Sequence, residues 1–435
     1  MILPVLFLFR NNNSITLITN KVHLSFTGIS IVNSLNVFTI DYLKSITYTT
    51  FMTLLKTLIL CSALILVKTG FLQAQDISYT FEEIVRIGDT EEYDENYSFA
   101  FPHHLAVNAK GEIYVSDRRL NEIKIFDAEG TFIKKFGERG RGPGEFTEIS
   151  SMYIDPAQNH LVVVDRMNLR ATRFDLNGNY VDTHPLPEGP VISPWLGRAD
   201  GEGNHYLLYR IPVMPNQPRP ENDHLVHVYD SEFSEKTGSL VEASLYGNLD
   251  NYVIDRSIGG PSTGLFELIK QNRLVGAPHF YEGEIYLFEK KESVWVNSMI
   301  LQGKQPAGEV IREVDANDPP EYAVRMGTPR GAIAYLKFST SIGLHPVDDN
   351  TLAHYVHFQD ENYENGEVGV SLFDLNNGDY LGYTKIEELT VDHSEPKSTG
   401  WNIQIKTYKD NKIYFVDNRY SEPQVVMAEI EFELD

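Results

Sequence analysis

The sequence predicts an all-β fold, a six-bladed β-propeller of four-stranded antiparallel blades, closed by an N-terminal strand. Three observations predict it. Of the 435 residues, 42% are hydrophobic, which suits a large packed core. A stretch of sequence recurs after 48 positions, and each copy divides into short strands separated by turn residues. Units of about 40 to 50 residues with four strands each are typical of propeller blades.

The longest strongly apolar run, Thr57 to Val67, comes before the repeats. A membrane-spanning helix needs about 20 apolar residues, so this run better matches the apolar region of a signal peptide. Met52 then reads as the start, Lys56 as its basic region and Leu72-Gln73-Ala74 as a cleavage signal. We therefore expect a signal peptide at 52–75 and a periplasmic or secreted mature domain at 76–435.

Other interpretations of this region stay open. The same segment would serve as an uncleaved membrane anchor if it were not processed. Cys61 suggests a lipoprotein, although Leu60 stands before it where a lipobox needs a small residue. Residues 1–51 share no repeat with the rest of the chain, and we expect them to be a non-native upstream extension.

Charge and cysteine content limit the possible partners. Cys61 is the only cysteine, so the expected mature chain can form no disulfide. That chain holds 32 basic and 60 acidic residues, a net charge of −28, which disfavours nucleic acid and anionic membranes as partners. The acidity fits a soluble exported protein or an acidic binding site. We expect a monomer without a stable transmembrane segment.

The internal repeat is clearest in two neighbouring units. Tyr114–Arg118 is matched 48 positions later by Val162–Arg166, and Phe126–Gly130 by Phe174–Gly178. Glycine and aspartate in the turns between strands favour tight hairpins. The strands predicted for the first unit are Leu105 to Val107, Glu112 to Ser116, Glu122 to Phe126 and Phe132 to Phe136.

Four further units complete the count of six. The aromatic-Asp strand end recurs at Tyr229-Asp230 and Phe373-Asp374, and weaker units begin at Glu284 and Lys412. The last unit ends at Asp435 after three strands. We expect Ile77 to Ile87 to supply the fourth, which would pair the two chain ends in one sheet.

The first unit also resembles an NHL repeat. The resemblance covers Phe101 to Asp117, Phe136-Gly137 and the glycine-rich Gly140 to Phe146; it weakens in the second unit and fades in the others. Together with the leader, this pattern is similar to exported bacterial six-bladed propellers of TolB-like fold. Such a resemblance specifies the fold better than the function, because propellers support many activities.

Histidines and polar residues are expected near the central channel of such a ring. Alignment of the units places His103 and His104 at the channel mouth, with Ser150, Ser151 and Gln404 in equivalent positions. The metal-site hypothesis adds residues from the fourth and fifth units: His279 and His345, in inner-strand positions. Imidazoles around one axis would hold zinc or calcium, while the alternative is that each is an isolated hydrogen-bonded side chain.

Arginines form a second candidate set. Arg118, Arg166 and Arg419 follow Asp117, Asp165 and Asp417, so the repeat would arrange them around the ring. Guanidinium groups facing the channel would bind a carboxylate or sulfate in bidentate fashion. In the structural alternative, each Asp caps a turn and pairs with an Arg within or between blades.

Two proline-rich insertions, Ile211 to His224 and Gln305 to Arg330, interrupt the repeat as long loops. They carry either ligand specificity or disordered decoration. The sequence shows no nucleophile elbow, no metalloprotease helix and no phosphate-binding loop.

We therefore expect an exported binding module for a peptide, glycan or partner protein at the channel face. The alternative is a metal-dependent hydrolase or lyase, because propellers that this chain resembles include lactonases and peptide-amidating lyases. A third hypothesis is a subunit of an envelope complex.

Overall fold

The computed structural model describes residues 2–11, 14–25, 28–41, 77–88, 92–186, 193–210, 224–242, 264–292, 294–320, 323–328, 331–362, 365–392, 403–420 and 422–434. The chain forms two compact units, Met1–Gln73 and Ala74–Asp435. The first unit contains an antiparallel sheet of β1 (Ile2–Asn11), β2 (Ser14–Ser25) and β3 (Gly28–Asp41). The expected signal peptide, Met52 to Ala74, lies outside the described residues, so export remains a prediction.

The second unit is all-β, as the sequence predicts, and its described residues contain no α-helix. Six antiparallel sheets follow one another along the chain. The first three consist of β5 (Pro102–Val107), β6 (Ile113–Asp117), β7 (Glu122–Phe126) and β8 (Phe132–Phe136); β9 (Ile149–Asp155), β10 (His160–Asp165), β11 (Arg170–Asp175) and β12 (Tyr180–Pro185); and β13 (Ser193–Ala199), β14 (His205–Arg210), β15 (His224–Tyr229) and β16 (Lys236–Glu242).

The other three sheets have the same up-and-down order. They consist of β17 (Leu265–Ile269), β18 (Arg273–Ala277), β19 (Glu284–Lys291) and β20 (Val294–Gln302); β24 (Ser339–Pro346), β25 (Thr351–Gln359), β26 (Asn365–Asp374) and β27 (Tyr380–Lys385), with β28 (Val391–Asp392) beside β26; and β29 (Ile403–Lys409), β30 (Lys412–Asp417), β31 (Gln424–Leu434) and β4 (Ile77–Ile87).

The strands of the first sheet match their sequence-based prediction closely. β7 and β8 have the predicted bounds, and the tight turns between strands are present. Between β7 and β8, Asp127 accepts hydrogen bonds from the backbone N–H groups of Glu129 and Thr131, and Gly130 has a φ of 82°. Only glycine adopts such a φ without strain, which explains the Asp-x-x-Gly spacing.

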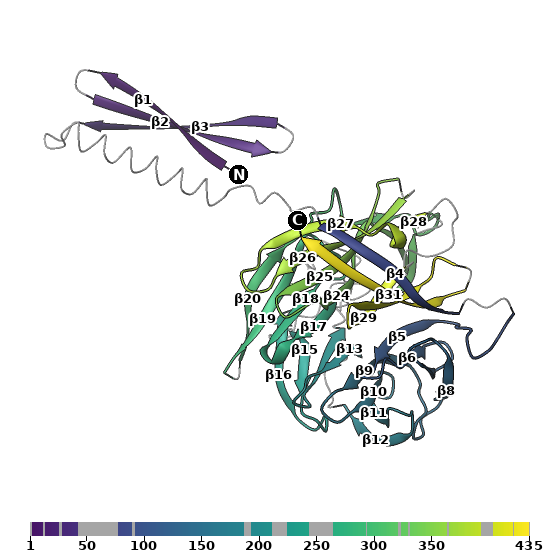
Figure 1. The fold of residues 1–435 in the computed structure, drawn as a ribbon. Helices are drawn as coiled ribbons and strands as arrows, with labels where there is room; N and C mark the ends of the chain where they lie inside the picture. The colour runs from purple at the N-terminus through teal and green to yellow at the C-terminus, as the bar shows by residue number, and fades with distance from the viewer. Residues whose placement is uncertain are drawn as a thin grey trace. The chain divides into compact units, whose positions relative to one another are not determined.

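The first strands of the six sheets lie against one another. β5 contacts β9, β9 contacts β13, β13 contacts β17, β17 contacts β24, β24 contacts β29, and β29 contacts β5. In Figure 1 these strands lie toward the inside of the unit, and β8, β12, β16 and β20 lie at its periphery. The arrangement is propeller-like.

β4 is the fourth strand of the sixth sheet. It pairs antiparallel with β31 from Ile77↔Leu434 to Ile87↔Val425, so strands from the two ends of this unit lie side by side (Figure 1). The hydrogen bonds of β4 occupy the edge of β31, which an incomplete sheet would leave unpaired.

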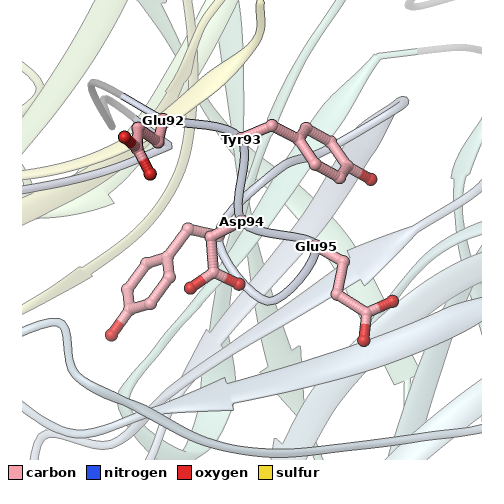
Figure 2. Close-up of a pocket in the computed structure, with 5 residues that line it drawn as sticks. Glu92, Tyr93, Asp94 and Glu95 are labelled. Carbon is pink, nitrogen blue, oxygen red and sulfur yellow. The ribbon is translucent and has the colours of Figure 1, made fainter.

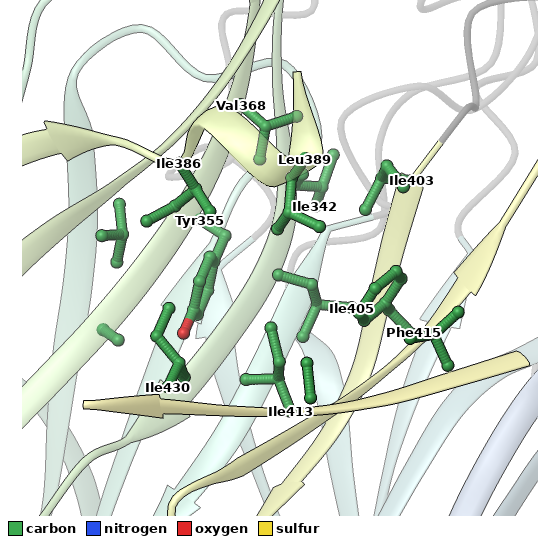
Figure 3. Close-up of a cluster of buried hydrophobic side chains, with 14 of the residues drawn as sticks. Ile342, Tyr355, Val368, Ile386, Leu389, Ile403, Ile405, Ile413, Phe415 and Ile430 are labelled. Carbon is green, nitrogen blue, oxygen red and sulfur yellow. The ribbon is translucent and has the colours of Figure 1, made fainter. Parts of the chain in front are cut away.

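Apolar side chains fill the spaces between neighbouring sheets. Figure 3 shows the cluster between the fifth and sixth sheets, where Tyr355 of β25 and Ile405 of β29 pack with Phe415 of β30. All three are at most 3% exposed. Burial of this kind contributes about 1.5 to 3 kcal/mol per large side chain, so packing alone can stabilise the unit.

The two proline-rich insertions differ in what the structure describes. Residues 211–223 of the first lie outside the described part. The second contains β21 (Ile311–Val314) and β22 (Val324–Thr328), which pair with β23 (Gly331–Lys337) on its two sides. The prediction of a long loop at Gln305 to Arg330 was therefore wrong in part, because two of its segments find a strand partner beyond the insertion.

In the described part of the chain, no helix has the length and apolar character needed to span a membrane.

Candidate functional site

Charged, histidine, glutamine and tryptophan side chains interact with one another around the first strands. We call this set the cationic cluster. Its members are His103, His104, Arg118, Glu148, Arg166, Trp195, Arg198, Glu267, His345, Gln404 and Lys406.

β-bulges contribute to the local geometry of this cluster. The pairing register shifts in the first strands of five sheets, which leaves one extra residue in each. Bulges re-aim side chains and are common beside functional sites. The extra residues are His103, Ser150, Trp195, Ile342 and Lys406.

His103 and His104 are joined by a hydrogen bond of 2.6 Å between Nδ1 of the first ring and Nε2 of the second. Burial lowers the pKa of both imidazoles well below the usual value, and the charge of Lys406 lowers each pKa further. Both rings are therefore neutral near pH 7. In this bond one nitrogen donates a single proton and the other accepts it.

Trp195 of β13 forms the aromatic part of the cluster. The ring of His103 meets the indole edge-on at 5.8 Å. The guanidinium carbons of Arg118 and Arg166 lie 5.8 and 6.0 Å from the indole centroid. Cation–π contacts of this kind contribute about 0.5 to 1 kcal/mol or more, depending on exposure.

Glu148 links the same two arginines. Its Oε1 atom accepts hydrogen bonds from Nε of Arg118 at 3.0 Å and forms an ion pair with Nη2 of Arg166 at 2.6 Å. Burial alone would raise the pKa of Glu148, but the hydrogen bonds from Arg166 and Arg118 outweigh it and lower that pKa. Glu148 is therefore an anion that holds both guanidinium groups beside Trp195.

Lys406 and Arg198 extend the cluster to two other strands. Lys406 of β29 donates to Oε1 of Gln404 at 2.5 Å, and burial lowers the pKa of its half-buried ammonium to about 7. The nearby charge of Arg198 lowers that pKa further. Arg198 of β13 forms an ion pair of 2.8 Å with Glu267 of β17.

The two predicted serines have structural contacts in the inner strands. Ser150 donates to the carbonyl of Val164 at 3.3 Å, and Ser151 accepts from the N–H of Gly197 at 2.7 Å. Gln404 occupies the pairing position of His104, as the sequence alignment predicts, since each faces the penultimate residue of its second strand.

The four histidines proposed as metal ligands do not converge on one point among the described residues. His345 lies in β24, where its ring stacks with Tyr408 at 6.1 Å. The inner-strand placement of His279 was wrong: it follows the end of β18, the second strand of its sheet, because β17 supplies the inner strand. Among the described residues, no three His, Cys, Asp or Glu side chains converge to hold a metal ion.

The three repeated arginines also divide. Arg118 and Arg166 meet at Glu148, whereas Arg419 bonds to Asp417 and to the carbonyls of Glu388 and Thr390. The structural alternative therefore describes Arg419 well. Arg118 and Arg166 pair with a glutamate that neither interpretation included.

The sequence analysis did not predict several residues of the cluster: Glu148, Trp195, Arg198, Glu267 and Lys406. They lie in or beside the first strands of the second, third, fourth and sixth sheets. The third and fourth units match the repeat only weakly, so the sequence did not identify their first strands, β13 and β17. For Lys406 the bulge after Ile405 breaks the two-residue alternation on which such an alignment depends.

A hollow lies in the loop before β5, lined by Glu92, Tyr93, Asp94, Glu95 and Tyr97. Figure 2 shows the labelled side chains projecting from one loop in different directions. Lys124 of β7 holds this loop by donating to the carbonyls of Glu95 and Ser98 at 2.7 and 2.6 Å. The hollow shares no residue with the cationic cluster.

Comparisons with known proteins agree with the fold and leave the function open. Residues 104–295 match a family described as a domain of unknown function (DUF4934). No curated protein matches the chain. A solved member of the duf4221 family from Bacteroides vulgatus is 11% identical, with a TM-score of 0.51, and the alignment covers 83% of this chain and all of that one.

Two other solved structures are more distant in shape. A candidate exported protein from Bacteroides fragilis is 13% identical with a TM-score of 0.48, over 82% of this chain and 95% of that one. Virginiamycin B lyase from Staphylococcus aureus is 11% identical with a TM-score of 0.39, over 81% and 99%.

Proposed function

We propose that this chain is an exported binding module, a six-bladed β-propeller that recognises a peptide, glycan or partner protein at the cationic cluster. The mutual contacts of the six first strands support a closed ring. The pairing of β4 with β31 supports closure by the N-terminal strand. The NHL-like first unit and the leader at Met52 to Ala74 support a TolB-like exported propeller.

The observation that carries the proposal is the environment of Trp195. The indole is half-buried on an inner strand, with two arginines and a histidine around it. Tryptophan and arginine are the residues most enriched at binding hot spots, because they combine a large apolar face with directed hydrogen bonds. The part of the ring that stays exposed can stack on a sugar or an aromatic side chain.

The metal-dependent hydrolase or lyase is the alternative, and the electrostatics of the cluster disfavour it. Four cationic side chains, those of Arg118, Arg166, Arg198 and Lys406, lie near the two histidines and would repel a zinc or calcium ion. Nδ1 of His103 and Nε2 of His104 are already bonded to each other. A metal would need their remaining nitrogens.

Binding and metal content together test the proposal. Purified parent protein is screened on mixed glycan and peptide arrays, and its metal content is measured by mass spectrometry. We expect a ligand whose affinity falls at least roughly tenfold in Trp195→Ala, as for a hot-spot residue. Tyr93→Ala is the matched control, because Tyr93 is 80% exposed and lies outside the cluster.

If a ligand binds Trp195→Ala and the parent with equal affinity, the binding site lies outside this cluster. Zinc or calcium at one ion per chain, retained through purification, would instead favour the hydrolase or lyase. Export is tested by N-terminal sequencing of secreted protein, which should begin near Gln75; a mature chain that retains Met52 would contradict it.

A further inference from the structure

We infer that the cationic cluster binds an oxyanion group of its ligand, a carboxylate or a sulfate, with Lys406 and Arg198 as the contacting cations. The inference rests on the proposed binding function of this site and adds the chemical class of the ligand.

The first argument is the charge of the cluster. It contains four permanent or titrating cations and two carboxylates, Glu148 and Glu267. Glu148 forms ion pairs with Arg118 and Arg166, and Glu267 forms an ion pair with Arg198. Within the described part of the chain, Lys406 has no carboxylate within ion-pairing distance; its only hydrogen bond is to the neutral amide of Gln404.

The second argument is that polar atoms in the cluster lack partners. Nε of Arg166 and Nε2 of His345 are buried and form no hydrogen bond with the described residues. His345 is only 3% exposed. The Nε–H of Arg166 is a donor at any working pH, and a buried donor without an acceptor costs about 1 to 3 kcal/mol, which a bound oxyanion would recover.

The third argument is position. β13 and β29 are three steps apart in the order of first strands, so Arg198 and Lys406 lie on opposite strands of the ring. The charge of Arg198 lowers the pKa of Lys406 and also that of His345 on β24. Side chains from three first strands are therefore close enough to interact electrostatically.

A structural role explains this arrangement poorly. Partial removal of an ammonium from water without a counter-ion destabilises a fold, and an apolar residue of similar volume is often more stable in such a position. The expected mature chain is strongly acidic, yet the carboxylates of this cluster are fewer than its cations. A ligand that supplies the missing negative charge would account for the excess.

The charge of Lys406 also makes the affinity depend on pH. The groups shown to interact with it are Gln404, Arg198, which pairs with Glu267, and the neutral His103 and His104 of β5; the pair Arg118 and Arg166 with Glu148 lies beside His103. Because burial lowers the pKa of Lys406 to about 7, its ammonium form predominates below pH 7 and is lost above it. An oxyanion should therefore bind more tightly at pH 6 than at pH 8.5.

Isothermal titration calorimetry of the chain beginning at Asp76 tests the inference. The probes are glucuronate, inorganic sulfate and uncharged glucose, each at pH 6 and pH 8.5 and at constant ionic strength. We expect glucuronate, sulfate or both to bind about tenfold more tightly at pH 6, since a lysine with a pKa near 7 is mostly charged there. The anion that binds identifies the ligand group, and glucose should not bind.

Two variants of Lys406 and one control variant test whether this side chain binds the anion. Lys406→Met should weaken anion binding at least tenfold at pH 6 and remove the pH dependence, without lowering the melting temperature. Lys406→Arg should keep the affinity and extend it to pH 8.5, because guanidinium stays charged. Lys291→Met is the control, because the Lys291 side chain is 66% exposed at the end of β19.

The inference is overturned if neither anion binds, if Lys406→Met binds like the parent, or if glucose competes equally with glucuronate. None of these results contradicts the binding module itself. An array ligand lost in Trp195→Ala and kept in Lys406→Met would retain the proposed function and reject the oxyanion.

Discussion

At the scale of single residues, a buried aspartate organises the approach to the cluster. Asp117 is fully buried, and its Oδ2 accepts from the N–H groups of Ala100 and Phe101 at 2.6 and 3.0 Å. Its Oδ1 accepts from Arg119 and Leu120, both at 3.0 Å. One carboxylate therefore joins the segment that enters β5 to the turn that leaves β6. This turn carries Arg118 toward Glu148.

Asp117→Asn should lower the free energy of unfolding by about 2 kcal/mol, because an amide NH₂ cannot accept two of these four bonds. Urea unfolding measures the loss. Asp127→Asn is the matched control: its carboxylate caps a solvent-facing turn through two Oδ1 bonds and should cost less. Equal losses in the two variants would show that the buried position has no special role.

At the scale of elements, β4 couples the beginning of the second unit to its end. Ile77 and Ile87, at the two ends of the strand, are at most 6% exposed. Arg86 adds an ion pair of 3.2 Å with Asp417 of β30. Without β4, β31 would present a row of unpaired backbone groups and the apolar side chains beneath them.

Deleting residues 77–87 from the chain that begins at Asp76 should lower the melting temperature and cause aggregation, because an exposed edge strand pairs with other copies. Differential scanning calorimetry and light scattering measure both effects. The chain that begins at Asp76 with β4 intact is the control for removal of residues 1–75. An unchanged melting temperature after the deletion would mean that β4 does not close the ring.

At the scale of the whole molecule, buried neutral histidines link stability to pH. Burial lowers the pKa values of His279, His345 and His354 to about 3. In the unfolded chain these histidines have pKa values of about 6.5. Between about pH 3 and 6.5 the unfolded chain therefore binds more protons than the folded chain. Stability contributed by the neutral rings is therefore complete above about pH 6.5 and falls on acidification.

We expect the melting temperature to decrease steadily from pH 7.5 to pH 5, because the free energy of unfolding falls by up to about 1.4 kcal/mol per pH unit for each such histidine. His354 is a suitable probe, because its Nε2 is hydrogen-bonded to the hydroxyl of Ser341 at 2.9 Å and it lies outside the cationic cluster. His354→Gln should reduce the slope of stability against pH, whatever its effect at pH 7.5. A slope identical to that of the parent would refute this assignment.

The sequence by itself determined the repeating part of this protein. The 48-residue repeat and the Asp-x-x-Gly turns are local patterns, so they predicted the strands of the first sheet, including β7 and β8. The incomplete last unit also predicted the partner of β31, because a missing fourth strand has to come from another part of the chain.

Only the tertiary structure decided what gathers at the inner strands. Trp195 and Lys406 occupy bulges, where the alternation that guides sequence alignment fails. Glu148 joins Arg118 and Arg166 from neighbouring sheets, a contact that depends on how the sheets pack. The physical reason is range: strands and turns follow from local patterns, whereas the charge of a site depends on side chains far apart in sequence.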